Sequence, residues 1–350
     1  MSEVLALIDK LSRDRSLTEE EYEIVVSGFS PAAASYAASL ASSVRASYYG
    51  SAVFMRGLIE ISNYCRNDCL YCGIRRSNRS CSRYRLSPSE ILACAEKGYG
   101  LGFRTFVLQG GEDPYYTDAV LCSIVSSLKS SFPDCAVTLS MGERSHESYA
   151  ALFAAGADRY LLRHETACPE HYARLHPSSM SFSNRMECLS SLRSIGYQVG
   201  CGFMVGSPYQ DASCLARDLK FIETFRPDMC GIGPFVPHKD TPFGSFPAGS
   251  SDLTCYLLSL IRLIYPPVLL PATTALGTVD PMGREKGLKA GANVVMPNLS
   301  PVAVRSKYTL YDNKICTGEA ASECVSCLGS RIKNAGYQLV VDRGDIRKEI

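Results

Sequence analysis

The sequence lacks an excess of charge of either sign, a long apolar run and an apolar leader. Its 36 Lys and Arg residues nearly balance its 35 Asp and Glu residues, which gives a formal charge of +1 and an isoelectric point near 7.4. A balanced charge gives no reason to expect a polyanionic partner, so we expect no binding of nucleic acid. No apolar run approaches the roughly 20 residues that span a bilayer, and the N-terminal segment MSEVLALIDKLSRDRS carries acids among its apolar residues. The sequence therefore predicts a cytoplasmic protein without a membrane partner.

Cysteine is unusually abundant, with 16 among the 350 residues. We do not expect a disulfide framework, because such frameworks stabilise small secreted domains and this chain is long enough to bury its own core. Most of the cysteines lie singly within apolar or helical patterns, and we interpret them as small core residues. Examples are Cys94, Cys122, Cys188 and Cys255. Only two groups are clustered, and these two merit a chemical interpretation.

Alternating strand and helix patterns predict the fold. Residues 2 to about 45 have helical spacing and predict an N-terminal cap. Eight short β-rich stretches then alternate with amphipathic segments over about 245 residues, which predicts a complete (β/α)₈ TIM-type barrel, with a doubly wound open sheet as the alternative. The stretches are MRGLIEIS, FRTFVLQ, AVTLSM, ADRYLLR, QVGCGFMV, MCGIG, VLLPA and ANVVMP. We divide the chain into a helical cap (1–50), the α/β barrel (51–300) and a C-terminal extension (301–350).

The first cysteine group lies in ISNYCRNDCLYCGIRR, directly after the first predicted strand. Cys65, Cys69 and Cys72 would share one face of a helix, but Asp68 and Gly73 are turn residues, and a helix would string the sulfurs over about 10 Å. Structural zinc takes four ligands in two close pairs, and no fourth ligand lies at a suitable spacing. An iron–sulfur cubane held by three cysteines would leave one iron open for chemistry.

The C-x3-C-x2-C spacing, with the aromatic Tyr71 before the last cysteine, resembles the signature of the radical S-adenosylmethionine (SAM) enzymes. The resemblance implies that Cys65, Cys69 and Cys72 hold a 4Fe–4S cluster whose open iron chelates SAM. It also implies that one electron from the cluster cleaves SAM to methionine and a 5′-deoxyadenosyl radical. The difficult chemistry would then belong to the cofactor, and the protein would position and shield it.

Polar residues follow several other predicted strands, at the edge where a barrel has its active site. QGGED after the second strand resembles the Gly-Gly-Glu of the superfamily, which implies that Gly110 and Gly111 let the backbone approach SAM and that Glu112 binds its ammonium group. A charged triplet after the fourth strand is not expected to be buried without partners, although an ion pair at the rim is an alternative. The further candidates at strand ends are Ser140, Arg163, His164, Glu165, Thr273, Thr274, Met296 and Asn298.

Several longer stretches closely resemble the HydE family, the radical-SAM maturases that help to assemble the active-site cluster of iron-only (FeFe) hydrogenases. They are SNYCRNDCLYCGIRRSN, QGGEDPYY, GADRYLLRHETA, GIGPFVPHKDTP, PATTALGT, GANVVMPN and YDNKIC. The resemblance implies that Ser140, Glu165 and Arg185 contact SAM. It further implies that Arg163, Thr273, Thr274 and Met296 line a substrate cavity.

The family resemblance also implies a substrate and partners. The substrate would be an organometallic iron species with carbonyl, cyanide and cysteine ligands, whose sulfur-containing portion the radical attacks. The implied partners are the maturases HydG and HydF and a reducing electron donor. Methylornithine synthase and biotin synthase share the fold and the first cluster and are alternatives, as is a non-catalytic iron–sulfur carrier. The RHETA and PATTALGT strings favour the maturase.

The second cysteine group forms C-x7-C-x2-C in the C-terminal extension. Cys316, Cys324 and Cys327 resemble the accessory iron–sulfur site of some HydE family members, a variable site that the family does not need for activity. We interpret them as a peripheral cluster, with zinc or free thiols as alternatives. The insertion in HPSSMSFSNR weakens the match at Arg185 but not at Glu165.

Overall fold

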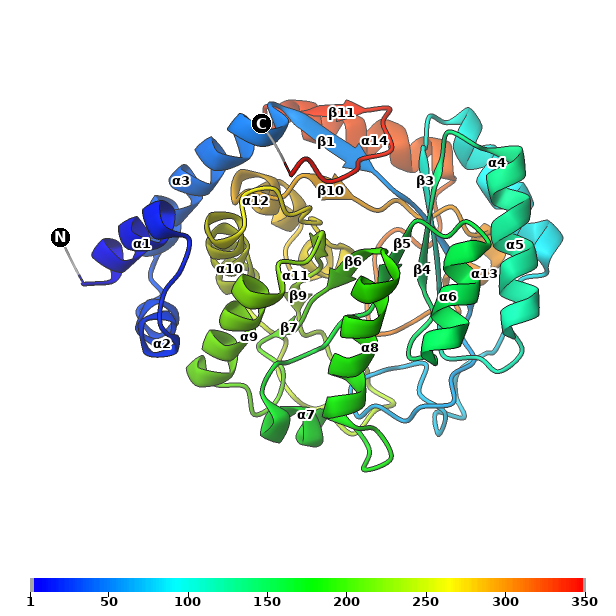
Figure 1. Ribbon diagram of the computed structural model, residues 1–350, viewed down its shortest axis with the longest axis horizontal. Helices are drawn as coiled ribbons and strands as arrows, with labels where there is room; N and C mark the ends of the chain where they lie inside the picture. The colour runs from blue at the N-terminus through cyan, green and yellow to red at the C-terminus, as the bar shows by residue number, and fades with distance from the viewer. Residues whose placement is uncertain (1–2, 349–350) are drawn as a thin grey trace.

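Three helices precede the first strand in the computed structural model, which describes residues 3–348. Figure 1 shows them packed outside the barrel, where α2 and α3 contact α9 and α10. Buried Ala33, Ala37 and Ala41 lie on one face of α3 and let it approach α10 closely. The helices are α1 (Glu3–Asp14), α2 (Glu19–Ser27), α3 (Pro31–Tyr49), α4 (Pro88–Gly100), α5 (Asp118–Ser131), α6 (His146–Ala154), α7 (Pro169–Leu175), α8 (Phe182–Ile195), α9 (Ala212–Phe225), α10 (Ser251–Ile264), α11 (Thr274–Val279), α12 (Gly283–Lys289), α13 (Val302–Arg305) and α14 (Ala321–Asn334).

Parallel strands close into a barrel. Six of them form one sheet in the order β2 (Gly57–Ser62), β3 (Thr105–Gly110), β4 (Ala136–Ser140), β5 (Arg159–Leu161), β6 (Gln198–Cys201) and β8 (Met229–Cys230). Single parallel bridges pair Met229 with Leu269, Pro271 with Val294 and Leu58 with Asn298, so the seventh and eighth predicted stretches complete the ring. The closed ring confirms the predicted TIM-type barrel and excludes the open sheet.

Three predicted strands are interrupted. MRGLIEIS contains the end of β1 (Ala52–Met55) and all of β2, while QVGCGFMV divides into β6 and β7 (Met204–Val205), and MCGIG into β8 and β9 (Gly233–Pro234). A Cβ atom on Gly202 would lie 2.1 Å from the carbonyl oxygen of Gly231, so only glycine fits where β6 ends. β1 pairs with β10 (Val294–Val295) and with β11 (Gln338–Val340), a strand that the sequence did not predict. The division of the chain at residues 50 and 300 stays a prediction.

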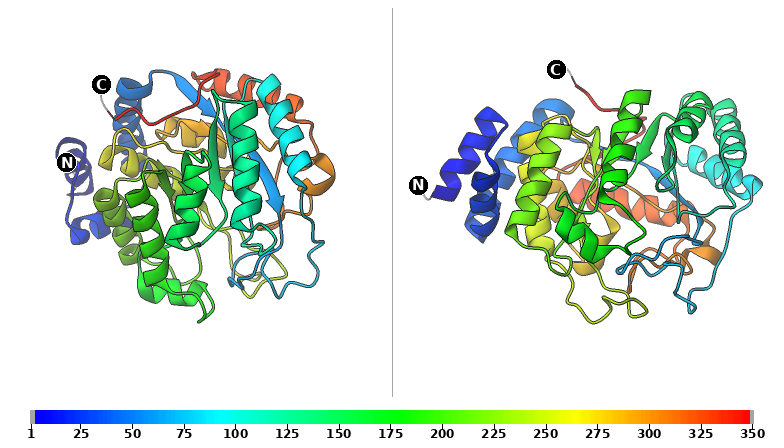
Figure 2. Two further views of the ribbon diagram at one scale, coloured as in Figure 1. Left: turned by 45° about the vertical axis from the view of Figure 1, so that its right-hand side comes forward. Right: turned by 60° about the horizontal axis from the view of Figure 1, so that its bottom comes forward.

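Helices surround the barrel, as the two views in Figure 2 show. α4 begins with a capping box: Ser87 N donates to Glu90 Oε2 at 2.7 Å, and Glu90 N donates to Ser87 Oγ at 3.3 Å. The long connection between β2 and α4 lies at the carboxyl ends of the strands. Within residues 3–348, no helix is long and apolar enough to cross a membrane.

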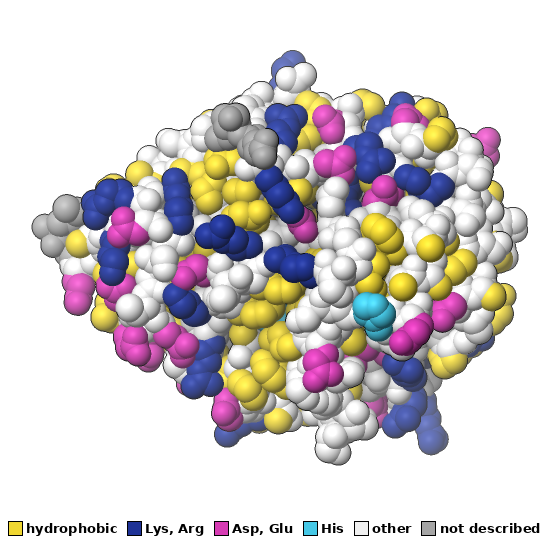
Figure 3. Space-filling model, in the orientation of Figure 1, with side chains coloured by type: hydrophobic (Ala, Val, Ile, Leu, Met, Phe, Trp, Pro, Cys, Tyr) yellow, Lys and Arg dark blue, Asp and Glu magenta, His cyan; other side chains and the backbone are white. Residues whose placement is uncertain are grey.

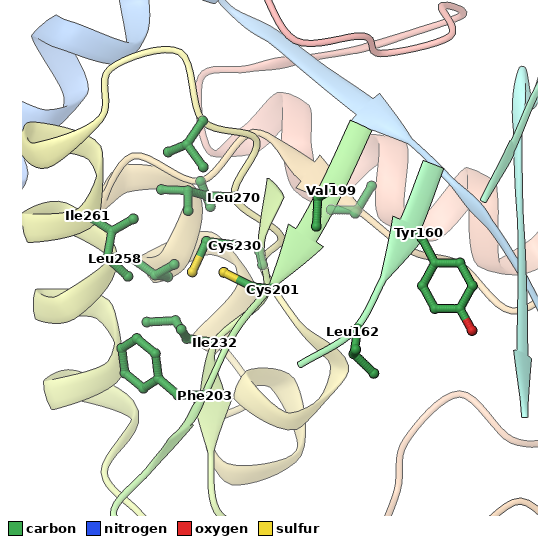
Figure 4. Packing of buried hydrophobic residues seen from close by; sticks show 14 of the residues in the cluster. Tyr160, Leu162, Val199, Cys201, Phe203, Cys230, Ile232, Leu258, Ile261 and Leu270 are labelled. Atoms are coloured by element: carbon green, nitrogen blue, oxygen red, sulfur yellow. The ribbon is translucent and has the colours of Figure 1, made fainter. Parts of the chain in front are cut away.

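The core between the sheet and α10 contains two of the isolated cysteines. Cys201 and Cys230 occupy paired positions on β6 and β8, both are fully buried, and Figure 4 shows their sulfur atoms directed toward each other beside Leu258 and Ile261 of α10. They pack there as small apolar side chains. Cys94 and Cys188 are also buried, and Cys122 and Cys255 pack against the same core, which confirms our interpretation of the isolated cysteines.

Candidate cluster and substrate site

The segment after β2 curls, as its turn residues predict: residues 63–84, the cluster loop, contain neither helix nor strand. Asp68 fixes one side of the cluster loop, because its carboxylate accepts hydrogen bonds from Arg75 Nε at 2.7 Å and from Ser77 Oγ at 2.7 Å. Arg83 fixes the other side by donating to the backbone carbonyl oxygens of Asn63, Ile74, Arg75 and Asn78. The loop therefore holds its shape through side chains outside the cysteines.

Gly111 allows the cluster loop to pack against the end of β3. A Cβ atom there would lie 2.2 Å from the carbonyl oxygen of Tyr64 and 2.8 Å from Cβ of Cys65. The backbone N–H of Arg66 donates to the carbonyl oxygen of Glu112 at 2.9 Å and joins the two segments. The family resemblance implied that this glycine lets the backbone approach SAM, and the structure adds a packing reason that involves no ligand.

The three thiols of the cluster loop line one cavity and are partly shielded from water. Burial raises the pKa of each thiol, and it raises the pKa of Cys72 to about 12. Neighbouring Cys72 and Cys65 raise the pKa of Cys69 further. No three His, Cys, Asp or Glu side chains among residues 3–348 converge closely enough to hold one metal ion. Three thiols that line one cavity suit an iron–sulfur cluster, in which each thiolate binds a separate iron.

The cavity at the carboxyl ends of the strands has a volume of about 350 Å³, within the usual range of small-molecule sites. Apolar residues such as Leu161, Met204 and Phe235 form much of its wall. A more open cleft of about 640 Å³ adjoins it at Glu112 but contains no cysteine, so we place the site in the smaller cavity. The predicted residues that line the cavity are Cys65, Cys69, Tyr71, Cys72, Gly110, Gly111, Glu112, Ser140, Arg163, Glu165, Arg185, Thr273 and Met296.

The charged triplet Arg163, His164 and Glu165 follows β5, which is the fourth predicted strand. Its side chains lie in two different environments. Glu165, with a left-handed φ of 65°, turns its carboxylate toward Arg163, and Oε2 lies 3.1 Å from Nη2 of that arginine. Within residues 3–348, neither of these two atoms nor Arg163 Nε has a hydrogen-bond partner, and unsatisfied buried polar groups of this kind suit a polar ligand. His164 instead leaves the cavity, and its Nε2 lies 3.2 Å from Oδ1 of fully buried Asp218. The structure thus removes His164 from the candidates.

Arg185 reaches the cavity from α8 despite the insertion before it. Its Nε donates to Oε1 of Glu143 at 2.6 Å, and its Nη1 donates to the carbonyl oxygen of Arg163 at 2.5 Å. Burial opposes the charge of the guanidinium, but the adjacent Glu143 carboxylate favours it, and the pKa of Arg185 is raised. This side chain is therefore a fixed cation at the wall of the cavity.

Thr274, a predicted cavity residue, and Asn298, a further candidate at a strand end, do not line the cavity. The hydroxyl of Thr274 accepts a hydrogen bond from Arg284 Nη2 at 3.4 Å, while its neighbour Thr273 both lines the cavity and caps α11. Asn298 donates to Oε2 of buried Glu60 at 2.8 Å and serves the barrel wall. Adjacent residues of a turn face different directions, so two hydroxyls in sequence do not form one subsite.

The second cysteine group lies apart from the cavity. Arg284 Nη2 lies 3.7 Å from Cys316 Sγ, and the contact with Cys324, together with Arg284, lowers the pKa of Cys316. Cys324 is buried, whereas Cys327 is exposed one turn further along α14. Two of the three thiols are thus in contact, and the third faces solvent.

Sequence reasoning missed residues that cover the cavity from outside the barrel strands. Tyr308, Leu310 and Tyr311 line it, and they belong to a segment that ends at Cys316. Met180, within the insertion, places its sulfur 3.7 Å from Sγ of Cys69. Neither of these two segments follows a strand. A search for polar residues at strand ends therefore could not find these cavity residues. The YDNKIC string was the only signal, and it indicated the family rather than a position.

Comparison with known proteins agrees with this geometry. The model of the Radical SAM superfamily matches residues 59–222. The HydE subunit of [FeFe] hydrogenase maturase from Thermotoga maritima is 44% identical over 95% of this chain and 94% of its own length. A 3-methylornithine synthase from Methanosarcina acetivorans is 30% identical over 73% of this chain and 72% of its own length.

Solved structures share the fold. The crystal structure of methylornithine synthase (PylB) has a TM-score of 0.83 and 27% identity, covering 95% of this chain and 97% of its own. The FeFe-hydrogenase maturase HydG from Carboxydothermus hydrogenoformans has a TM-score of 0.80 and 20% identity, covering 96% of this chain and 78% of its own. The second likeness shows the barrel alone, whereas the identity to the Thermotoga protein spans the site. The chain therefore belongs to the HydE family of FeFe hydrogenase maturases, within the radical SAM superfamily.

Proposed function

We propose that this protein acts on an organometallic iron precursor of the FeFe hydrogenase active-site cluster. The observation that carries the proposal is one cavity with the three cysteines at one end and Arg163, Thr273 and Met296 on its remaining wall. The precursor would carry carbonyl, cyanide and cysteine ligands and would arrive from a partner maturase of the HydG type. The product would pass on toward HydF and the hydrogenase.

The chain has groups that suit a 4Fe–4S cluster and SAM, the cofactors of the radical SAM superfamily. Cys65, Cys69 and Cys72 would hold the cluster through three thiolates, which leaves one iron free of protein ligands. When bound, the cluster and SAM supply the chemistry, which is the reductive cleavage of SAM to methionine and a 5′-deoxyadenosyl radical. Glu165 and Arg185 offer an acceptor and a cation that suit the ammonium and carboxylate of an amino acid. The same end of the cavity, where SAM would bind, is also lined by Ser140, Gly110 and Glu112.

The remaining wall would bind and shield the substrate. Within residues 3–348, Nε and Nη2 of Arg163 have no hydrogen-bond partner, and this cation suits ligands with negative charge such as cyanide or the cysteine carboxylate. Met229, Phe235 and Met296 provide apolar surface that excludes water from the reacting atoms. We further propose that Cys316, Cys324 and Cys327 hold an accessory cluster that the reaction does not need.

Reductive cleavage of SAM tests the radical chemistry. The protein is reconstituted anaerobically with iron and sulfide, dithionite and SAM are added, and 5′-deoxyadenosine is measured. We expect its formation by the wild-type protein and none by Cys69→Ala. No cleavage by a wild-type protein with a complete cluster would refute the assignment to radical chemistry.

Hydrogenase maturation tests the substrate. The chain is expressed in a host that makes an FeFe hydrogenase but lacks its own HydE, and hydrogen evolution is measured with formation of 3-methylornithine. We expect hydrogen evolution to return and no 3-methylornithine to form. The opposite pattern would assign the protein to the synthase that it also resembles.

A further inference from the structure

The segment that contains the cluster loop is far more basic than the rest of the chain. Residues 64–85 contain six arginines and one acid, whereas the whole chain has a formal charge of +1. Figure 3 shows Lys and Arg side chains at the lower right rim, over the light-blue segment that follows β2 in Figure 1. Such a concentration of one sign creates a field that attracts a partner of the opposite sign.

Three of the six arginines have a carboxylate partner. Arg75 pairs with Asp68, Arg66 pairs with Glu112, and Arg85 pairs with Asp113, with contacts of 2.7, 2.9 and 2.7 Å. Each of these three cations is therefore balanced locally. Arg66 nevertheless remains exposed, with 58% of its side chain accessible. Exposed pairs of this kind contribute little attraction of their own.

The other three arginines are not balanced by acids of the loop. Arg83 donates only to backbone carbonyl oxygens, while Arg76 and Arg79 are exposed and form no ion pair within residues 3–348. The adjoining segments contribute Lys239, Asp240 and Asp312, which offset one positive charge. The surface remains net positive, and Arg76 and Arg79 carry the charge that faces solvent.

Two exposed aromatic rings flank an arginine on the same surface. The guanidinium of Arg85 lies 3.9 Å from the ring centre of Tyr64 and 5.1 Å from that of Tyr115. The two tyrosines are 36% and 48% exposed, respectively. Tyrosine and arginine are among the residues most enriched at the centres of protein interfaces. The patch thus combines an aromatic centre with cations beside it.

This surface lies directly over the cluster site, because exposed Tyr64 and Arg66 flank Cys65 in the chain. We propose that it docks a small acidic electron-carrier protein, such as a flavodoxin, an inference that rests on the proposed function. One electron leaves the reduced flavin, which is oxidised by one electron, and it reduces the cluster held by the three cysteines by one. No bond or proton is exchanged in this step.

Charge reversal tests the docking surface. Arg76→Glu/Arg79→Glu is compared with Arg13→Glu/Lys289→Glu, which makes the same change of charge on α1 and α12, away from the cluster loop. SAM cleavage is measured with reduced flavodoxin at several salt concentrations and separately with dithionite, which needs no docking. We expect the first variant to lose at least about tenfold in flavodoxin-driven rate at low salt, a difference that shrinks as salt rises. Its rate with dithionite should match that of wild type.

Other outcomes would overturn the proposal of a docking surface. Equal flavodoxin-driven rates for the two charge variants would refute it, as would a parallel loss with dithionite, which would indicate a disturbed cluster instead. Flavodoxin binding to the immobilised protein gives a readout without catalysis, and Tyr115→Ala should weaken it by at least about tenfold as a central interface residue. Absent SAM cleavage by wild type with dithionite would refute the proposed function, while the binding measurement would still decide the docking surface.

Discussion

The hydroxyl of Tyr71 lies 3.2 Å from Nε2 of His176, which joins the cluster loop to the end of α7. Nδ1 of His176 lies 3.0 Å from the carbonyl oxygen of Tyr172 and donates to it, so Nε2 is the acceptor for the tyrosine. Burial lowers the pKa of His176 to about 3, so the ring is neutral. The residue before Cys72 is thus held by a hydrogen bond from outside the cluster loop.

Tyr71→Phe tests this contact while keeping the ring. The change leaves a buried acceptor on His176 without its donor, at a cost of about 1–3 kcal/mol, and we expect SAM to bind about tenfold more weakly. Titration of SAM into the reconstituted protein measures the affinity. Tyr172→Phe is the matched control, because the Tyr172 hydroxyl has no hydrogen-bond partner within residues 3–348. Equal affinities of the two variants would contradict a positioning role for the Tyr71 hydroxyl.

The sequence predicted the elements of the barrel and the residues at strand ends better than the contacts among them. Eight stretches of strand pattern and the spacing of Cys65, Cys69 and Cys72 are local features, so they could be predicted. Which way Thr274 and His164 face depends on Arg284 and Asp218, which lie far away in the sequence. Long-range partners leave no local periodicity, so the sequence could not predict which way these two side chains face.

Gly111→Ala tests the packing of the cluster loop. The added Cβ atom would overlap the carbonyl of Tyr64 and Cβ of Cys65, so the loop must move, and we expect a large loss of bound iron after reconstitution. Iron analysis and the visible absorbance of the cluster measure the effect. Gly100→Ala is the control, because a Cβ atom there meets no other atom within 4 Å. A full complement of iron in Gly111→Ala would show that the cluster loop tolerates the shift.

The two cysteine groups should respond differently to substitution. Cys69→Ala removes one of three cluster thiols, so we expect SAM cleavage to be abolished and the bound iron to fall sharply. Cys324→Ala alters the group near Arg284, outside the cavity, so cleavage should be largely unchanged while any iron held there is lost. Parallel measurement of iron content and 5′-deoxyadenosine separates the two. The reverse pattern would show that the second group holds the catalytic cluster.

Acid should loosen the attachment of the N-terminal helices through Glu223. This carboxylate on α9 accepts from Tyr22 Oη at 2.7 Å, from Ser16 Oγ at 2.8 Å and from Lys220 Nζ. Partial burial works to raise its pKa, but these hydrogen bonds outweigh it and lower the pKa below its ordinary value of 4.5. Because the folded pKa is lowered, the stabilisation is full above pH 4.5 and is lost as the pH falls through the folded value.

Glu223→Gln therefore should lower stability near neutral pH by about 1–3 kcal/mol and should differ little from wild type in strong acid. Thermal unfolding across a pH series measures the difference. Exposed Glu23→Gln on α2 removes the same charge without these contacts and should have little effect. A difference between Glu223→Gln and wild type that is constant with pH would contradict the assignment.

The segment that covers the cavity is anchored by a buried ion pair. Lys314 donates to Oε1 of Glu60 at 2.5 Å and to the carbonyl oxygen of Tyr308 at 2.9 Å, and both charged side chains are almost fully buried. Burial raises the pKa of Glu60 even in the presence of Lys314. The pair links the interior of the barrel to a segment that no strand pattern predicted.

Lys314→Met should destabilise the protein by about 3–5 kcal/mol, because it leaves the Glu60 carboxylate buried without its cation. Without Lys314, the pKa of Glu60 in the folded protein rises further above its pKa in the unfolded chain. A carboxyl group with such a raised pKa costs no stability below its unfolded pKa but destabilises the folded protein as the pH rises above it. The destabilisation by Lys314→Met should therefore be larger at about pH 8 than at about pH 5. Chemical unfolding of the single variant and of Glu60→Gln/Lys314→Met measures both effects. The double variant should recover much of the stability, since an amide can still accept from Asn298 without a buried charge. A double variant less stable than Lys314→Met would mean that Lys314 acts mainly through Tyr308, and the anchor of the covering segment would then be that backbone contact alone.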